Sequence, residues 1–364
     1  MDIGNRIGKT VHIKHVITAI AAVSILKAVA AAVLLTYGHD IFAGGNDSYE
    51  YDLYARGLSA NLPPNFWSSI LRWLHSVGLY SRRGISLVLM SLSFFFIPYL
   101  TARISSVPSA GRNERTFWIA FLLTSMYPTL FYFSLDLYRD VFMLFCFLIA
   151  VWPVKLFFES KTKPTRRNAA LLLLFTGLCF LLYLLRFYLG LTLFISLFLC
   201  SFFSFSRHSV LLWCTAFLLL LWALAAAGGL DRLFEFRLYL QTIPANTKTG
   251  ILFDNILFFP VSFFKSALTQ LFSFFFVNIT TTITFLLEGL PFTLAFAYLL
   301  KNRRYADKFV DFLVVFFCVY GSFWLIGMDN VGSAVRYRIF NYIPVLISCM
   351  IVFQRKEAIE NTPE

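Results

Sequence analysis

The chain has 364 residues, of which 59% are hydrophobic and only 14% are charged. Ordinary soluble domains have roughly 45–50% apolar and about 25% charged residues, so this composition excludes a soluble globular protein. The net charge of +12, from 31 basic and 19 acidic residues, does not indicate a nucleic-acid partner, because the basic residues lie in short segments between apolar blocks, where they report membrane topology.

The apolar residues gather into blocks of about the length that crosses the hydrocarbon core of a bilayer. The first block, 16–37, follows a basic segment and is too long for a typical signal-peptide core, so we expect a retained signal anchor. Further blocks lie at 84–102, 116–134, 141–157, 169–185, 187–205, 209–227, 256–277, 283–300, 309–327 and 339–353. This pattern predicts an all-α, polytopic integral membrane protein.

Basic clusters assign the sides of the membrane, because loops rich in Lys and Arg stay in the cytoplasm. The N-terminus and the clusters at 103–115, 155–167 and 301–308 are therefore expected to be cytoplasmic. If both 256–277 and 283–300 crossed the membrane, the C-terminal basic residues would end outside. One of these two blocks is therefore expected not to cross.

Block 256–277 is the better candidate, because Pro260, Lys265 and Gln270 interrupt it, as in an interfacial or re-entrant segment. The prediction is one transmembrane domain over 1–364 with about ten transmembrane helices and both termini cytoplasmic. Its outer loops are 38–83 and 228–278, and the mixed apolar and polar spacing within the first predicts interfacial amphipathic helices.

Several chemistries lack their sequence signals. The six cysteines all lie inside apolar blocks without CxxC or paired spacing, so neither a disulfide framework nor a zinc site is indicated. No nucleotide-binding or zinc-protease motif occurs, which disfavours a nucleotide-driven pump.

On the predicted outer side, the cation is nearly always arginine. Arginine carries a planar fork of donors that holds phosphate or carboxylate with two hydrogen bonds. The set is Arg56, Arg72, Arg82, Arg83, Arg139, Arg186, Arg232, Arg237, Arg336 and Arg338, with Lys248 and Lys265. We infer an anionic, phosphate-bearing ligand; the alternative is that these arginines reach lipid headgroups or pair with nearby acids.

The first outer candidate site follows the first block. Asp47, Tyr51 and Ala55 are four residues apart and so share one face of a predicted helix. Asp47 with Glu50 three residues later is also a capping-box pattern at a helix start. A cap explains Asp47, but it does not explain the cluster of four acids beside the membrane, which are Asp40, Asp47, Glu50 and Asp52.

The second candidate site is the short connection 134–140. Asp140 suits an N-terminal position in the next helix, where the helix dipole favours a carboxylate. Asp136 and Asp140 around Arg139 suit equally a sugar, a metal ion or a general base.

Two arginine turns form the third candidate. Arg186 is the only charge at a predicted hairpin tip, so it needs a partner to offset its desolvation. Arg336 and Arg338 precede the last block. Lys27 and Glu288 lie within apolar blocks, where ionisable residues mark functional sites or interhelical salt bridges.

The run from Asp47 through Tyr51 to Ala55 resembles the first outer-loop motif of GT-C glycosyltransferases, in which the aspartate is the catalytic carboxylate. The segment from Tyr127 to Asp140 is similar to the next outer segment of that family. The closing pattern Asn330, Gly332, Arg336 and Arg338, the Arg186 hairpin and the outer segment with Pro260 are similar to features of bacterial O-antigen and exopolysaccharide repeat-unit polymerases.

The resemblance implies a GT-C-like inner-membrane enzyme with its active site facing the periplasm. It would transfer sugars from a polyprenyl-linked (undecaprenyl-type) donor to a glycan or lipid-linked acceptor, building a cell-surface polysaccharide such as lipopolysaccharide. Asp47 and Asp140 are the expected catalytic residues, and a divalent cation stays open as a cofactor. The expected substrate-binding residues are Glu50, Tyr51, Asp136, Arg139, Arg186, Arg237, Arg336 and Arg338.

Two alternatives stay open. Abundant outer arginine favours a diphosphate donor and a polymerase over a monosaccharide transferase that uses a monophosphate. A transporter or flippase of lipid-linked glycans would also need phosphate-binding arginines. Transporters place their sites near mid-membrane between repeated halves; here the charges crowd one face and no repeat is visible, which favours an enzyme.

Overall fold

The structure is a computed structural model that describes residues 3–37, 47–59, 63, 65–107, 114–160, 166–205, 210–243 and 247–360. These residues form helices and no strand, and one isolated antiparallel bridge joins Lys248 to Asn330. They gather into two compact units, Met1–Leu191 and Thr192–Glu364.

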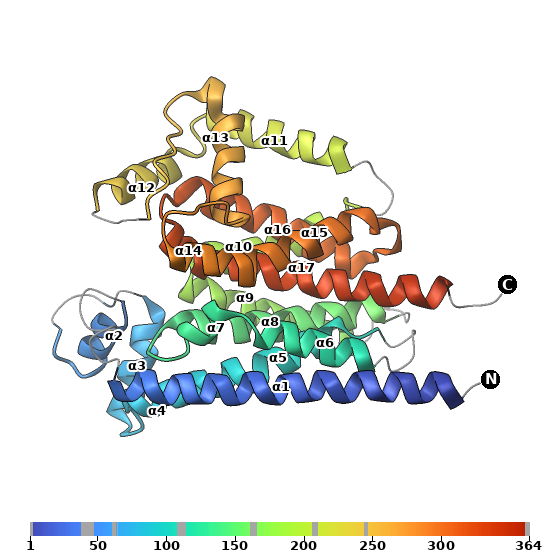
Figure 1. The fold of residues 1–364 in the computed structure, drawn as a ribbon. Helices are drawn as coiled ribbons and strands as arrows, with labels where there is room; N and C mark the ends of the chain where they lie inside the picture. Colours follow the sequence, from blue (N-terminus) through green and yellow to red (C-terminus); the bar gives the residue numbers. More distant parts are fainter. Residues whose placement is uncertain are drawn as a thin grey trace. The chain divides into compact units, whose positions relative to one another are not determined.

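Unit 1 is built from long helices with two short ones beyond their ends (Figure 1). Helix α1 packs on α6, α5 packs on α6 and α8, α8 packs on α9, and the short helices α2 and α3 pack on each other. The elements are α1 (Ile3–Tyr37), α2 (Asp47–Ala55), α3 (Phe66–Ser76), α4 (Arg82–Ser91), the π-helical turn η1 (Leu92–Phe96), α5 (Ile97–Ser105), α6 (Glu114–Ser125), α7 (Pro128–Tyr132), α8 (Arg139–Glu159) and α9 (Arg166–Leu185).

Helix α10 (Phe187–Leu199) contains the boundary between the units. In unit 2, α16 packs on α12 and α17, and α17 packs on α15. The elements are α11 (Val210–Ala226), α12 (Asp231–Thr242), η3 (Ile256–Phe258), α13 (Phe259–Ser266), η4 (Ala267–Leu271), α14 (Ile279–Thr284), η5 (Phe285–Gly289), α15 (Leu290–Lys301), η6 (Arg303–Tyr305), α16 (Lys308–Gly327) and α17 (Val331–Glu360).

Seven helical segments of the described chain are long and apolar enough to cross a membrane, and α11 with α12, bent by 81°, adds an eighth if the pair is one span. The all-helical, multi-pass membrane architecture is therefore confirmed. The count of ten stays a prediction, because the predicted spans 116–134 and 187–205 correspond to the shorter helices α6 and α10. Block 256–277 is likewise represented by short helices, η3 to η4, that fall below spanning length.

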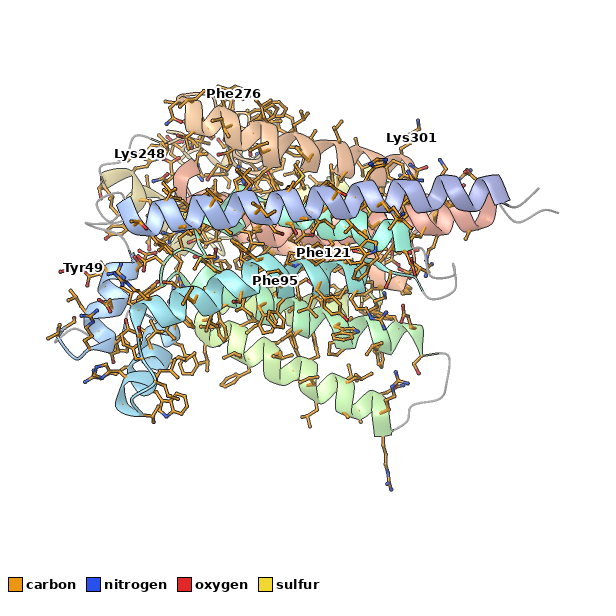
Figure 2. All side chains as sticks on the ribbon, turned by 60° about the horizontal axis from the view of Figure 1, so that its bottom comes forward. Tyr49, Phe95, Phe121, Lys248, Phe276 and Lys301 are labelled. Atoms are coloured by element: carbon orange, nitrogen blue, oxygen red, sulfur yellow. The ribbon has the colours of Figure 1, made fainter. Side chains whose placement is uncertain are left out.

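Apolar side chains cover the outside of the helices, as expected of a surface that faces lipid (Figure 2). Phe95 in unit 1 and Phe276 in unit 2 are each 56% exposed. Within unit 2, Lys248 and Lys301 mark opposite ends of the helices (Figure 2). The polar ends and the apolar sides follow the distribution that a bilayer imposes.

Side-chain caps set several helix starts. The Asn65 side chain accepts the N–H groups of Trp67 and Ser68 at the start of α3, and the Asp307 side chain accepts the N–H of Val310 at the start of α16. These bonds satisfy backbone donors that have no partner inside the helix.

Two π-helical turns directly precede prolines. Turn η1 ends at Phe96, two residues before Pro98, and η5 ends at Gly289, two residues before Pro291. Proline lacks the N–H that would bond to the carbonyl four residues earlier, so the helix loses one bond there. The wider turn accommodates that loss while the span continues.

The topology predicted from the basic clusters can be measured by reacting single introduced cysteines with a membrane-impermeant maleimide in intact cells. We expect labelling at positions within 47–59, 228–243 and 328–338, and protection within the 301–308 connection. Labelling of the 301–308 connection from outside would contradict the predicted orientation.

Candidate functional site

Helix α2 places two acidic residues on the surface of unit 1 and buries the phenol of Tyr51. Asp47 is the first residue of α2 and is exposed, as is Glu50, and both carboxylates lie in the first turn, where the helix dipole favours negative charge. Tyr51 is only 3% exposed. Its hydroxyl oxygen accepts a hydrogen bond from Asn65 Nδ2 at 2.9 Å, so the residue that caps α3 also fixes α2.

Asp136 is held by an arginine that sequence reasoning did not place in the site. Arg82 donates from Nε to Asp136 Oδ1 at 2.9 Å and from Nη2 to Oδ2 at 2.6 Å. Ser48 Oγ donates to Oδ2 at 2.7 Å, and the N–H of Leu137 donates to Oδ1 at 2.9 Å. Burial raises the pKa of Asp136, but these hydrogen bonds outweigh burial and hold the pKa below its usual value. Asp136 is thus ionised, and its two carboxylate oxygens link its own segment to the start of α2 and the start of α4.

Asp52 is a second buried carboxylate that sequence reasoning missed. It accepts hydrogen bonds from Arg56 Nε at 2.9 Å and from the Tyr80 hydroxyl at 2.5 Å, and Arg82 Nη1 lies 3.7 Å from its other oxygen. Burial, then the bond to Asp52, raises the pKa of Tyr80. The four-residue spacing from Asp52 to Arg56 is a sequence signal for a helix pair. Tyr80 and Arg82 carry no such signal, because they are distant in the chain.

The buried Arg186 has the partner that its burial requires, and that partner is Asp140. Arg186 lies between α9 and α10 and is 5% exposed, as is Asp140 in the first turn of α8. The Nη2 of Arg186 donates to Asp140 Oδ1 at 2.9 Å. The neighbouring Arg139 is half-buried, and its Nη1 donates to the carbonyl of Leu185 at 2.6 Å. Two arginines and one carboxylate thus meet where α8 begins and α9 ends.

The electrostatics of Tyr51 show which predicted residues come together. Burial is the largest cause that raises its pKa; the charge of Arg139 lowers the pKa, and the charges of Asp47 and Asp140 raise it. All three charges thus act on the same phenol, and the hydrogen bond from Ser48 Oγ to Asp136 Oδ2 at 2.7 Å ties the start of α2 to the segment before α8. With Arg186 bound to Asp140, they form the candidate site of unit 1: Asp47, Tyr51, Arg139, Asp140 and Arg186. Glu50 lies on the exposed side of α2.

Arg237 belongs to unit 2, where it joins the loop after α12 to the end of α16. It is 1% exposed, and its Nη2 lies 2.9 Å from Oδ1 of Asp329, which is fully buried. Its Nε donates to the carbonyl of Ile251 at 2.7 Å, and its Nη1 donates to the carbonyls of Leu325, Ile326 and Met328. These carbonyls end a helix and have no partner within it. The guanidinium group of Arg237 thus donates to acceptors of the protein itself, and its predicted role in substrate binding stays a prediction.

Arg338 and Glu288 form an ion pair deep in unit 2, where both are 1% exposed and Nη2 lies 3.0 Å from Oε2. Arg338 also donates to Ser273 Oγ. Gly289 is required beside them, since an added Cβ would lie 2.9 Å from Cβ of Ser273. Arg336, two residues before Arg338, is half-buried. Arg237, Arg336 and Arg338 thus lie in unit 2, and the candidate site lies in unit 1.

Lys27, the other ionisable residue within an apolar block, is 9% exposed. Its Nζ lies over the rings of Phe94 and Phe131, at 5.4 and 5.8 Å from the ring centroids. A cation above an aromatic face is stabilised by the ring quadrupole. This contact fastens α1 to the rest of unit 1.

Within the described ranges, His, Cys, Asp and Glu side chains form no group of three that could hold a metal ion. Asp136 and Asp140 instead bind arginine.

Comparisons with family models, with curated proteins and with solved structures found no match to this chain.

Arg237 gives a stability prediction. Replacing Arg237 by Met leaves Asp329 as a buried carboxylate without its counter-ion, so unfolding should become easier by roughly 3–5 kcal/mol. Combining Arg237→Met with Asp329→Asn should recover part of that loss. Thermal unfolding in detergent measures both, with Arg232→Met, an exposed position on the same helix, as the matched control. Equal unfolding of Arg237→Met and Arg232→Met would contradict the packing role.

Proposed function

We propose that this protein is a membrane glycosyltransferase that uses a polyprenyl-diphosphate-linked sugar or oligosaccharide to build a cell-surface polysaccharide at the periplasmic face of the inner membrane. The observation that carries the proposal is that the start of α2, with Asp47, is bonded through Ser48 to Asp136 in the segment that leads into α8, while Asp140 at the start of α8 binds Arg186. A carboxylate beside guanidinium groups at one end of apolar helices suits a substrate with an apolar anchor and an anionic head.

Asp47 is the carboxylate best placed to act as a general base. Asp136 and Asp140 are buried, each only 5% exposed, whereas Asp47 is exposed at a helix start, where an acceptor can reach it. In the proposed reaction its carboxylate takes the proton of an acceptor hydroxyl. The acceptor oxygen then bonds to the anomeric carbon of the donor as the bond from that carbon to the phosphate oxygen breaks.

The electron pair of the broken bond leaves on the diphosphate, which needs positive charge. Arg139 and Arg186 would supply it from the junction of α8, α9 and α10, where Asp140 orients Arg186. Fixed guanidinium groups that face a developing negative charge lower the barrier, because they need no reorganisation during the reaction. Two arginines favour a diphosphate over a monophosphate, and hence a repeat-unit polymerase over a monosaccharide transferase.

A transporter or flippase of lipid-linked glycans is the second candidate function. The observation that favours it is the Glu288–Arg338 pair inside unit 2, in which Glu288 belongs to the π-helical turn η5. Intramembrane ion pairs and interrupted helices are common at transport sites. In that case the glycan would cross the membrane with its bond to the lipid intact.

Replacing Asp47 by Asn separates a cap from a catalyst. Asparagine caps a helix about as well as aspartate, but its amide does not take a proton usefully, so losing a general base costs roughly a hundred- to ten-thousand-fold in rate. The variant is expressed in a strain that lacks the gene, and the polysaccharide of that strain is run on a gel. We expect Asp47→Asn to be expressed and inserted but not to restore the long polysaccharide ladder. Asp254→Asn, which changes an exposed carboxylate of unit 2, should restore the ladder. A normal ladder from Asp47→Asn would move the base to Asp140, Asp136 or Glu50.

Replacing Arg186 by Lys tests the leaving-group role. Lysine keeps the charge beside Asp140 but loses the fork that can hold two acceptors at once, so most activity should be lost while the protein still inserts. Arg72→Lys, at an exposed arginine of unit 1, should keep near-normal activity. Equal ladders from both variants would assign Arg186 to packing alone.

A further inference from the structure

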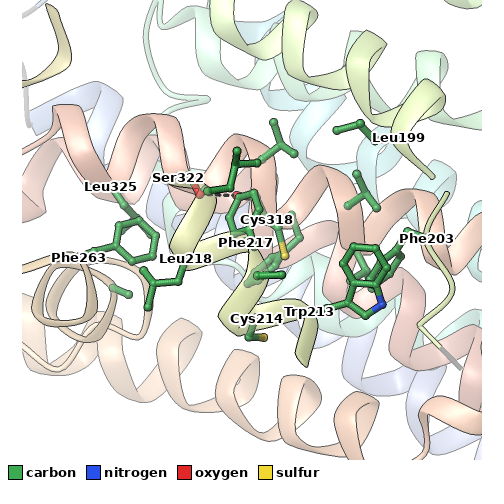
Figure 3. Close-up of a pocket in the computed structure, with 18 of the residues that line it drawn as sticks. Leu199, Phe203, Trp213, Cys214, Phe217, Leu218, Phe263, Cys318, Ser322 and Leu325 are labelled. Carbon is green, nitrogen blue, oxygen red and sulfur yellow. Dashed lines mark hydrogen bonds between the residues drawn. The ribbon is translucent and has the colours of Figure 1, made fainter. Parts of the chain in front are cut away.

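Unit 2 contains an apolar cavity of about 540 Å³ beside α11 and α16. Figure 3 shows its lining as a row, with Phe263 and Leu325 at one end, Phe217 and Cys318 between, and Trp213 and Phe203 at the other. Among the described lining residues the one hydroxyl, Ser322 Oγ, already donates to the Cys318 carbonyl at 2.8 Å. A polar ligand would lose its water contacts here without replacing them, so the cavity suits a hydrocarbon.

The length of the cavity matches a lipid chain in one leaflet. Its lining on α16 runs from Val314 to Leu325, twelve residues whose eleven steps of roughly 1.5 Å extend about 16 Å. A leaflet contributes half of a hydrocarbon core about 30 Å thick. The row therefore has the reach of one acyl chain.

Positive charge lies at the end of the row that Phe203 marks. The half-exposed Lys308 donates from Nζ to the carbonyl of Phe203 at 2.9 Å and lies six residues before Val314 on α16. Lys301 and Arg304, on the connection that leads to α16, are exposed as well. Asp311 offsets part of this charge at 3.5 Å from Lys308, but it is buried and also accepts the N–H of Phe205. The end of the cavity at Phe203 is therefore positively charged, and the rest of its lining is apolar.

We propose that this cavity binds one acyl chain of an anionic phospholipid, with the lipid phosphate held at Lys308. The apolar wall takes the chain, and the basic edge selects the headgroup, since basic residues beside a membrane attract anionic lipid. The bound lipid fills the space between α11 and α16. This site belongs to unit 2 and does not depend on the proposed glycosyl transfer.

Trp213 provides the probe, because bromine atoms on an acyl chain quench tryptophan on contact. The protein is placed in phosphatidylcholine nanodiscs with a minor fraction of phosphatidylglycerol carrying brominated chains, or the same fraction of brominated phosphatidylcholine. The signal of Trp213 is the difference between wild type and Trp213→Phe. We expect the brominated phosphatidylglycerol to quench it well beyond the brominated phosphatidylcholine.

Variants then separate the head from the tail. Lys308→Gln should raise the phosphatidylglycerol fraction needed for half-quenching about fivefold, whereas Lys356→Gln, on α17, should not change it. Cys318→Phe, which fills the cavity, should abolish the quenching, whereas Leu219→Phe, on the exposed side of α11, should not. Equal quenching by both brominated lipids in the wild type would overturn the anionic site, and no quenching of Trp213 would overturn lipid binding altogether.

Discussion

Charges buried among apolar helices require partners inside the protein, and this constraint shapes both units. In unit 1, Arg186 meets Asp140 where three helices end or begin. In unit 2, Arg237 meets Asp329 and also takes the carbonyls at the end of α16, while Arg338 meets Glu288. A bilayer offers no water to replace such contacts. The Asp140–Arg186 and Asp329–Arg237 pairs lie where helices begin or end, and the Glu288–Arg338 pair joins two segments long enough to cross a membrane.

The same constraint separates residues that hold the structure from those available for chemistry. Asp52, Asp136, Asp140 and Asp329 all accept hydrogen bonds from arginine at short distance. Asp47 stands apart because it is exposed while its charge still reaches the buried Tyr51. Asp47 is therefore the carboxylate that we assign as the base in the proposed transfer from a phosphate-linked donor.

The sequence was informative about local features and less so about contacts between distant segments. Apolar block length predicted the helical membrane architecture, and the lone charge at Arg186 predicted a buried partner at a turn. Block length did not show that the helix starting at Glu114 ends at Ser125, because α7 continues the apolar run after the break at Tyr127. The contacts of Arg82 with Asp52 and Asp136 were not predictable, since they join segments 30 and 54 residues away. Likewise, the abundance of arginine on the predicted outer side did not reveal that the guanidinium group of Arg237 donates hydrogen bonds to backbone carbonyls.

We propose that the bond between glycan and lipid breaks at this protein. The most direct measurement is to incubate the purified protein in proteoliposomes with a polyprenyl-diphosphate-linked oligosaccharide and to analyse the lipid products by mass spectrometry. If the protein transfers glycan, we expect free polyprenyl diphosphate to accumulate with time while the glycan lengthens. Donor that reaches the opposite leaflet with its diphosphate–sugar bond intact, and no free polyprenyl diphosphate, would contradict it.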